Sequence, residues 1–126
     1  MKQEDKDLLL KDLCGRLPYG VKVLYDTQIF EVQYIEPMHE ELKLLDNERY
    51  TLPIEEVKPY LIPFSSLTEE QWEELMLISE MRMTFTPDRL IAAYKYTIEW
   101  FLKNHIDYNN LIGKGLAIDA TDLNIY

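Results

Sequence analysis

The sequence predicts an α+β protein: a short N-terminal helix, a small five-stranded SH3-like antiparallel barrel, and then a helical hairpin. Two observations predict this order. Between residues 18 and 63, short apolar runs with alternating polarity are separated by turn residues, as in antiparallel strands. From Ser65 onward, apolar residues recur every three or four positions, which is the period of a helix. A chain of 126 residues has the length of one domain, so we expect a single domain over residues 1–126.

The N-terminal helix is expected over residues 4–15. Leu9, Leu10 and Leu13 have a helical spacing, acidic residues come early, and Gly15 stands where it can end the helix. Pro18 then breaks the pattern.

Residues 18–63 are expected to form the barrel. Residues 21–25 and 28–35 read as one hairpin across Asp26 and Thr27, and residues 42–45 and 49–52 as a second hairpin. One helical turn at 54–57 and an extended segment at 59–63 follow, and the prolines of that segment suit only an edge strand. Four strands, one turn and a short fifth strand are the order of SH3-like barrels. The analogy is topological and implies no function.

Residues 66–105 are expected to form the helical hairpin. Thr68 and Gln71 make a capping box, and Thr86 with Pro87 opens the second helix. The first helix has an apolar stripe of Trp72, Leu75, Met76, Ser79 and Met83. The second has a core-facing stripe of Leu90, Ile91, Tyr94, Ile98, Phe101 and Leu102. The short connection at 84–86 predicts antiparallel helices that pack on each other and on the barrel. Residues 106–126 are apolar enough that we expect them to dock.

Charge and cysteine content limit the partners. Thirteen basic and 23 acidic residues give a net charge of −10, which argues against direct nucleic-acid binding. An evenly spread negative charge is typical of a soluble protein, and the alternatives are attraction for a basic partner or mimicry of DNA by an inhibitor. The single cysteine, an acidic start and the lack of a long apolar run predict a cytoplasmic protein that does not contact a membrane.

No catalytic, cofactor-binding or metal-binding residue can be assigned from the sequence. Gly113 and Gly115 flank a lysine without the spacing of a phosphate loop, and a turn is the better interpretation. Cys14 with a histidine, His39 or His105, is more simply a packing cysteine than half of a thiol dyad. Four residues crowd one loop without a spacing that fixes metal geometry: Glu36, His39, Glu40 and Glu41. A solvated acidic loop accounts for them.

The aromatic residues of the first half suggest a peptide groove. SH3-like barrels bind extended segments on aromatic surfaces beside acidic loops, and tyrosine suits such a surface. The residues expected to line the groove are Tyr19, Tyr25, Tyr50 and Tyr60, with Glu41 or Glu48 at its rim. The alternative is that some of these tyrosines belong to the core, and it is the favoured one.

The second long helix carries another apolar set outside its predicted core stripe. Ala93, Tyr96 and Trp100 are three and four positions apart, so they share a face. That face must be covered, either by the docked C-terminal segment or by a second copy of the chain or a foreign partner.

Three strings give the chain a resemblance. They are KDLCGRLPYGVK at 11–22, IEEVKPYL at 54–61 with SSLTEE at 65–70, and DYNNLIGKGLA at 107–117. Over residues 11–120 the chain resembles a group of short uncharacterised proteins of gut Bacteroides-type bacteria and of their prophages and mobile elements. The resemblance implies a bacterial cytoplasmic, phage-related setting and transfers no activity, cofactor or partner.

The leading functional expectation is a non-enzymatic protein-interaction module or adaptor. Its partner would be a protein or peptide, with a basic one favoured by the charge, and a homo-oligomer stays open. The first alternative is an acidic inhibitor that mimics DNA, and the second is an enzyme with an unrecognised site.

Overall fold

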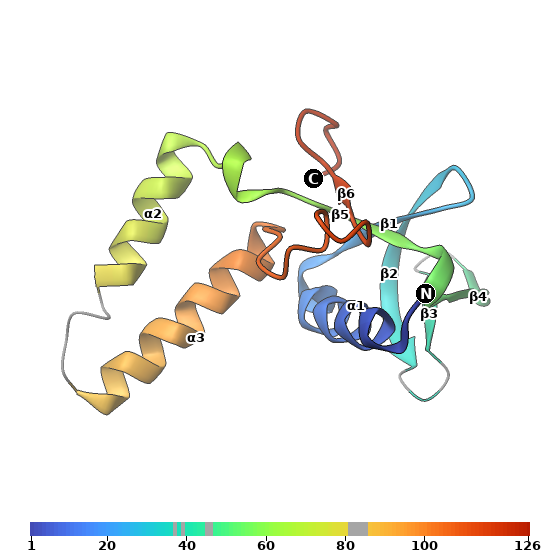
Figure 1. Cartoon of the computed structure of the whole chain (residues 1–126), viewed down its shortest axis with the longest axis horizontal. Helices are drawn as coiled ribbons and strands as arrows, with labels where there is room; N and C mark the ends of the chain where they lie inside the picture. The colour runs from blue at the N-terminus through green and yellow to red at the C-terminus, as the bar shows by residue number, and fades with distance from the viewer. Residues whose placement is uncertain (37, 39, 45–46, 81–85) are drawn as a thin grey trace.

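The fold is α+β, with an open, mixed six-stranded sheet and three α-helices in the described part of the chain (Figure 1). The computed structural model describes residues 1–126 except 37, 39, 45–46 and 81–85, and at 44 and 47–50 it describes the backbone alone. The helices are α1 (Gln3–Arg16), α2 (Glu69–Glu80) and α3 (Pro87–Lys103). The strands are β1 (Lys22–Tyr25), β2 (Gln28–Glu36), β3 (Glu41–Leu44), β4 (Asn47–Pro53), β5 (Lys58–Leu61) and β6 (Ile118–Asp119).

The sheet follows the order β4-β3-β2-β1-β5-β6. The strands β1 to β4 form an antiparallel meander, and β5 pairs antiparallel with β1. The strands β4 and β6 form the two edges of the sheet, so the closed SH3-like barrel predicted from the sequence is not confirmed. The predicted helix, hairpins and single turn do occur, the last as the 3-10 turn η2 (Ile54–Glu56).

The first hairpin is confirmed at the predicted residues. Tyr25 pairs with Gln28 across a two-residue turn. Asp26 and Thr27 both have positive φ, 46° and 68°, which matches the turn to the right-handed twist of the strands.

The prediction that the fifth strand lies at an edge is wrong. The strand β5 lies between β1 and the two-residue strand β6, which pairs parallel to it at Tyr60 and Leu61. Pro59 can lie in this interior strand because β6 is short. The strand β6 pairs only with Tyr60 and Leu61, which have backbone N–H groups, and not with the proline.

The helix α1 extends through Gly15 to Arg16, so Gly15 does not end it as predicted. The 3-10 turn η1 (Leu17–Tyr19) follows, and Gly20 ends it in a left-handed conformation with φ of 75°. Gly15 faces α3, because a Cβ there would lie 3.4 Å from Leu102 Cδ2.

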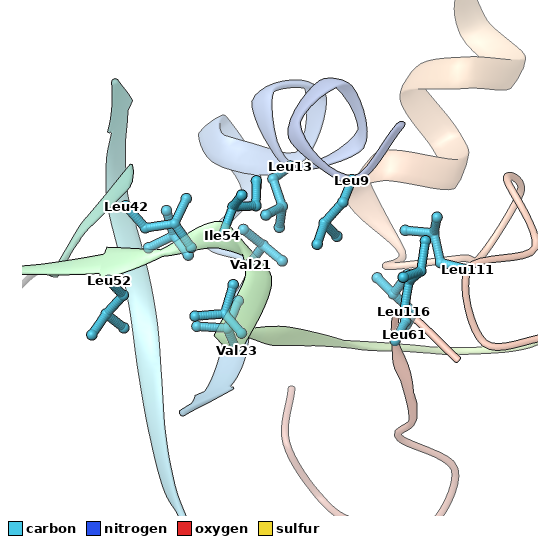
Figure 2. Close-up of a cluster of buried hydrophobic side chains, with 13 residues drawn as sticks. Leu9, Leu13, Val21, Val23, Leu42, Leu52, Ile54, Leu61, Leu111 and Leu116 are labelled. Carbon is cyan, nitrogen blue, oxygen red and sulfur yellow. The ribbon is translucent and has the colours of Figure 1, made fainter. Parts of the chain in front are cut away.

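The main core lies between α1 and the sheet (Figure 2). Leu9 and Leu13 of α1 point toward buried residues such as Val21, which precedes β1, and Leu42 of β3, and the C-terminal segment adds Leu111 and Leu116 to the same cluster. The segment after α3 is therefore part of the core, although it has little regular structure.

The helical hairpin begins as predicted. The capping box is confirmed: the Thr68 N–H donates to Gln71 Oε1 at 3.0 Å, and the Gln71 N–H donates to Thr68 Oγ1 at 3.1 Å. The helix α3 begins at Pro87, but the Thr86 side chain makes no capping hydrogen bond. Some residues with a predicted part lie outside the described residues: His39, Leu45, Met83, Thr84 and Phe85.

The predicted core face of α3 is wrong except at the C-terminal end of the helix. Ala93, Thr97 and Trp100 are the buried residues of its middle. Four members of the predicted stripe are exposed instead: Leu90, Ile91, Tyr94 and Ile98. Leu102 of the predicted stripe is buried and Phe101 is half-buried, so the stripe faces the interior only in the last turn of α3.

The hairpin does not pack along its length on the sheet. Figure 1 shows α2 and α3 projecting away from it, with the C-terminal end of α3 near α1. A second, smaller core of Leu67, Trp100 and Ile106 lies at that end.

Candidate functional site

A groove lined by aromatic residues lies where the hairpin meets the turn after α1. Its cavity is about 290 Å³ and is lined by Tyr19, Ile78, Tyr96, Glu99, Trp100 and Lys103. We call this set the aromatic groove. It joins η1, close to the N-terminus, to the helical hairpin of α2 and α3, so only the folded chain presents it.

Each aromatic ring in the groove is positioned by local structure. Tyr19 ends η1, whose direction is set by Pro18 at its start and by left-handed Gly20 after it. Tyr96 and Trp100 are four residues apart on α3 and therefore share a face. The Trp100 indole N–H donates to Glu74 Oε2 on α2 at 2.9 Å, which fixes the indole between the two helices.

The rim of the groove carries one acidic and one basic side chain. Glu99 and Lys103 are also four residues apart on α3, one turn beyond Tyr96 and Trp100. Exposed tyrosine rings offer flat apolar area with a wet hydroxyl, and their faces attract cations. The groove can therefore hold an apolar or cationic side chain of a partner.

A buried ion pair links α1 to the segment after α3. Arg16 Nε donates to Asp12 Oδ2 at 2.6 Å, and both side chains are fully buried. Arg16 Nη2 also donates to the Ile106 carbonyl at 2.6 Å, and Asn109 Nδ2 donates to Asp12 Oδ1 at 2.8 Å. Among the described atoms Arg16 Nη1 has no hydrogen-bond partner, and the guanidinium lies 5.4 Å from the centre of the Tyr108 ring. This cluster is closed to ligands and holds the fold.

A second polar contact fixes the end of the chain. The rings of His105 and Tyr126 are stacked with centroids 3.4 Å apart. Tyr126 Oη donates to the Tyr60 carbonyl at 2.8 Å and accepts from the Lys22 N–H at 2.9 Å. Burial lowers the pKa of His105 to about 4, and the charges of Arg16 and Lys22 act in the same direction. Burial raises the pKa of Tyr126 to about 12.

The predicted groove tyrosines whose side chains the structure describes have different surroundings. Tyr60 is buried, so its ring belongs to the core, as the favoured alternative held. Tyr25 is half-buried at the end of β1 beside Phe30, and the nearby Glu56 carboxylate raises its pKa. Glu41 is half-buried on β3. Tyr50 and Glu48 lie on β4, where the structure describes only the backbone.

Instead, the aromatic groove combines members of two predicted sets. Tyr19 comes from the predicted peptide groove, and Tyr96 and Trp100 come from the predicted partner face. Ala93 of the predicted partner face is fully buried. The helix α2 packs against α3 and covers part of that face. Sequence reasoning missed Ile78, Glu99 and Lys103. The four-residue spacings of Tyr96 with Trp100 and of Glu99 with Lys103 were the available signal.

Two other expectations can be placed. Cys14 is exposed rather than packed, and partial desolvation raises the pKa of its thiol. No group of three or more metal-ligating side chains occurs among the described residues. In the same part of the chain, no helix is both long enough and apolar enough to cross a bilayer.

Comparison of the chain with protein-family models, with curated proteins and with solved structures found no match.

Proposed function

We propose that the protein is a non-enzymatic interaction module that binds a segment of a partner protein in the aromatic groove. The observation that carries the proposal is the meeting of Tyr19, Tyr96 and Trp100 around one cavity. Tyr19 and Tyr96 stay exposed although each has a large apolar ring. Exposed aromatic residues at a concave site are typical of protein interfaces.

The segment that fits this groove carries a basic side chain. Aromatic faces attract a cation, and the carboxylate of Glu99 lies at the rim. The net charge of −10 attracts a basic segment at long range and speeds its association. The ammonium group of Lys103 at the same rim favours an acidic or carbonyl group next to that basic residue.

The setting we propose is a bacterial, phage-related adaptor in the cytoplasm, supported by the sequence resemblance. We further propose that β1 to β5 are an opened relative of the SH3-like barrel. The order β4-β3-β2-β1-β5 and the 3-10 turn η2 before β5 support this relationship.

A peptide selection tests the function. A display library of random peptides is selected on the wild-type chain and on the Tyr96→Ala variant. The matched control is Tyr94→Ala on the same helix, because Tyr94 and Tyr96 are similarly exposed, at 55% and 49%. We expect enriched peptides to contain Lys or Arg and to bind Tyr96→Ala at least about tenfold more weakly, a loss of about 1.4 kcal/mol. Tyr94→Ala should bind them within about twofold of wild type.

The chain supplies its own reporter for these peptides. Its two tryptophans are Trp72 and Trp100, so the Trp72→Phe variant leaves Trp100 in the groove as the only indole. Peptide binding should change Trp100 fluorescence, and replacing the basic residue of the peptide with norleucine should weaken binding. Peptides that bind Tyr96→Ala as well as wild type would contradict the proposal.

An inhibitor that mimics DNA is the second candidate, favoured by the exposed carboxylates of α2 at Glu69, Glu70, Glu73 and Glu80. Such an inhibitor would capture DNA-binding proteins from a bacterial lysate at low salt and release them at high salt. Replacing those four residues with Gln would abolish this capture, whereas Tyr96→Ala would leave it intact.

A further inference from the structure

The side of the hairpin that carries Phe101 and Met76 has a second, larger apolar surface. On α3, Ile91, Tyr94, Ile98 and Phe101 follow one another at intervals of three and four residues, so they form one stripe. The first three are exposed and Phe101 is half-buried. The stripe is the one that the sequence assigned to the core.

The helix α2 contributes the other half of this surface. Trp72 and Met76 line a hollow of about 260 Å³ together with Leu75, Ser79, Thr97 and Phe101. The hollow runs along the seam between the two helices, and Trp72 and Met76 stand exposed beside it. We call the exposed apolar residues on this side of the two helices the hairpin face: Trp72, Met76, Leu90, Ile91, Tyr94 and Ile98.

The hairpin face is large for a monomer. Its six members are each between 39% and 67% exposed. Large apolar and aromatic side chains offer roughly 150–250 Å² each, so the face presents about 600 Å² of side-chain surface, at the upper end of single patches on monomers. Figure 1 shows the hairpin projecting from the sheet, which leaves room for a second body against it.

We propose that the hairpin face binds the same face of a second copy of the chain, forming an antiparallel four-helix bundle. Two packed helices form one layer, and a layer with an apolar side is stable only against another layer. The face approaches the ~800 Å² that each partner contributes to an interface of standard size. A two-fold axis parallel to the helices places α2 of each copy over α3 of the other, antiparallel to it, as in simple four-helix bundles.

The charges beside the face agree with this arrangement. Glu80 ends α2, and Lys95 lies on α3 at about the same level, since Ile78 of α2 and Tyr96 of α3 line one cavity. Glu80 follows Met76 by one turn, and Lys95 follows Ile91 by one turn, so each borders the hairpin face. Rotation about the proposed two-fold axis leaves each residue at the same height along the helices and places α2 of one copy opposite α3 of the other. It therefore brings Glu80 of one copy near Lys95 of the other, twice.

Dimerisation would leave the aromatic groove open, because Tyr96 and Ile78 lie on the other side of the helix seam from Phe101 and Met76. A dimer would present two grooves on one rigid bundle. A partner with two copies of the bound segment would then gain avidity.

Sedimentation of the full chain between about 1 µM and about 200 µM tests the proposal directly. The weight-average mass of wild type should rise from 15.0 kDa toward twice that value. Met76→Glu and Ile91→Glu change one exposed residue on each helix, at 62% and 67% exposure, so the fold should survive. Both should stay at the monomer mass throughout. Leu77→Glu is the matched control, because Leu77 is 64% exposed on α2 outside the hairpin face, and it should dimerise like wild type.

The charge pair gives a second readout. Lys95→Glu should weaken the dimer a few-fold, and adding Glu80→Lys to the same chain should restore it. Tyr96→Ala should dimerise normally, so loss of the dimer and loss of peptide binding are separable. A wild type that stays at 15.0 kDa up to the highest concentration would overturn the proposal and assign the face to a foreign partner. A dimer that persists in Met76→Glu and Ile91→Glu would overturn it in favour of another surface.

Discussion

The two halves of the molecule bury their apolar residues to very different degrees. The sheet, α1 and the C-terminal segment share one core that includes fully buried Leu9, Leu13 and Val23 (Figure 2). The described part of α2, by contrast, has no buried residue, and α3 buries only Ala93, Thr97, Trp100 and Leu102. The sheet, α1 and the C-terminal segment, which we call the sheet half, bury their apolar side chains against one another. The hairpin instead exposes apolar surface that a partner can cover. Most of the buried core therefore lies outside the hairpin, and the partner binding that we propose would use the hairpin.

The largest expected effect concerns the buried ion pair that joins α1 to the segment after α3. Arg16→Met leaves Asp12 as a buried carboxylate without its cation, and it removes the bond to the Ile106 carbonyl. We expect a loss of about 3–5 kcal/mol in the free energy of unfolding, measured by urea denaturation.

The matched control for that variant replaces both partners. Asp12→Leu with Arg16→Met removes the buried charges together and should recover much of the loss. If the double variant is as unstable as the single one, the ion pair is not the reason for the effect.

A pair of truncations compares the two halves directly. Leu13→Ala removes a fully buried side chain and should cost about 3 kcal/mol, because a cavity remains in the core. Ile91→Ala should change the free energy of unfolding of the dilute chain by less than about 0.5 kcal/mol, because the side chain is exposed. Equal losses would show that the hairpin is buried as deeply as the sheet.

A smaller effect is the pH dependence of the free energy of unfolding that comes from His105, just after α3. In the folded chain the pKa of His105 is about 4, whereas in an unfolded chain it is near 6.5. Between these values the unfolded state binds more protons, so the stability from this group is present above pH 6.5 and is lost as the pH falls toward 4. We expect a loss of about 2 kcal/mol, less than the full shift implies, because part of the ring faces water.

The variant His105→Asn isolates this contribution from the carboxylates that titrate in the same range. Asparagine tolerates the positive φ of 60° at this position. Urea denaturation at several pH values should show a smaller loss in the variant than in wild type between pH 6.5 and 4. The same pH dependence in both proteins would contradict the assignment to His105.

The sequence was sufficient where local chemistry decides the structure. The turn at Asp26 and Thr27, the capping box at Thr68 and the start of α3 at Pro87 were all predictable, because each depends on neighbouring residues. The pairing of β6 with β5 was not, since a two-residue strand has no periodicity. The closure of the sheet was also undetermined, because strand order alone does not fix whether the edges meet.

The candidate site was predicted only in pieces. Tyr19, Tyr96 and Trp100 were each singled out, but their meeting depends on how the hairpin sits against η1. The helix α3 is apolar on two sides, so its periodicity could not say which side faces α2. The choice depends on how α2 and α3 pack together, and helix packing is a tertiary effect that a hydrophobic pattern does not express.

Hydrogen exchange of the full chain at two concentrations tests the central claim most directly. The claim is that the sheet half is complete by itself and that the hairpin is completed by a partner. We predict that amides of β1, β2 and β5 exchange slowly and equally at about 1 µM and about 200 µM, while those of α2 and α3 exchange faster at the lower concentration and become protected at the higher one. Amides of α2 as protected as those of β2 in the most dilute sample would contradict the account.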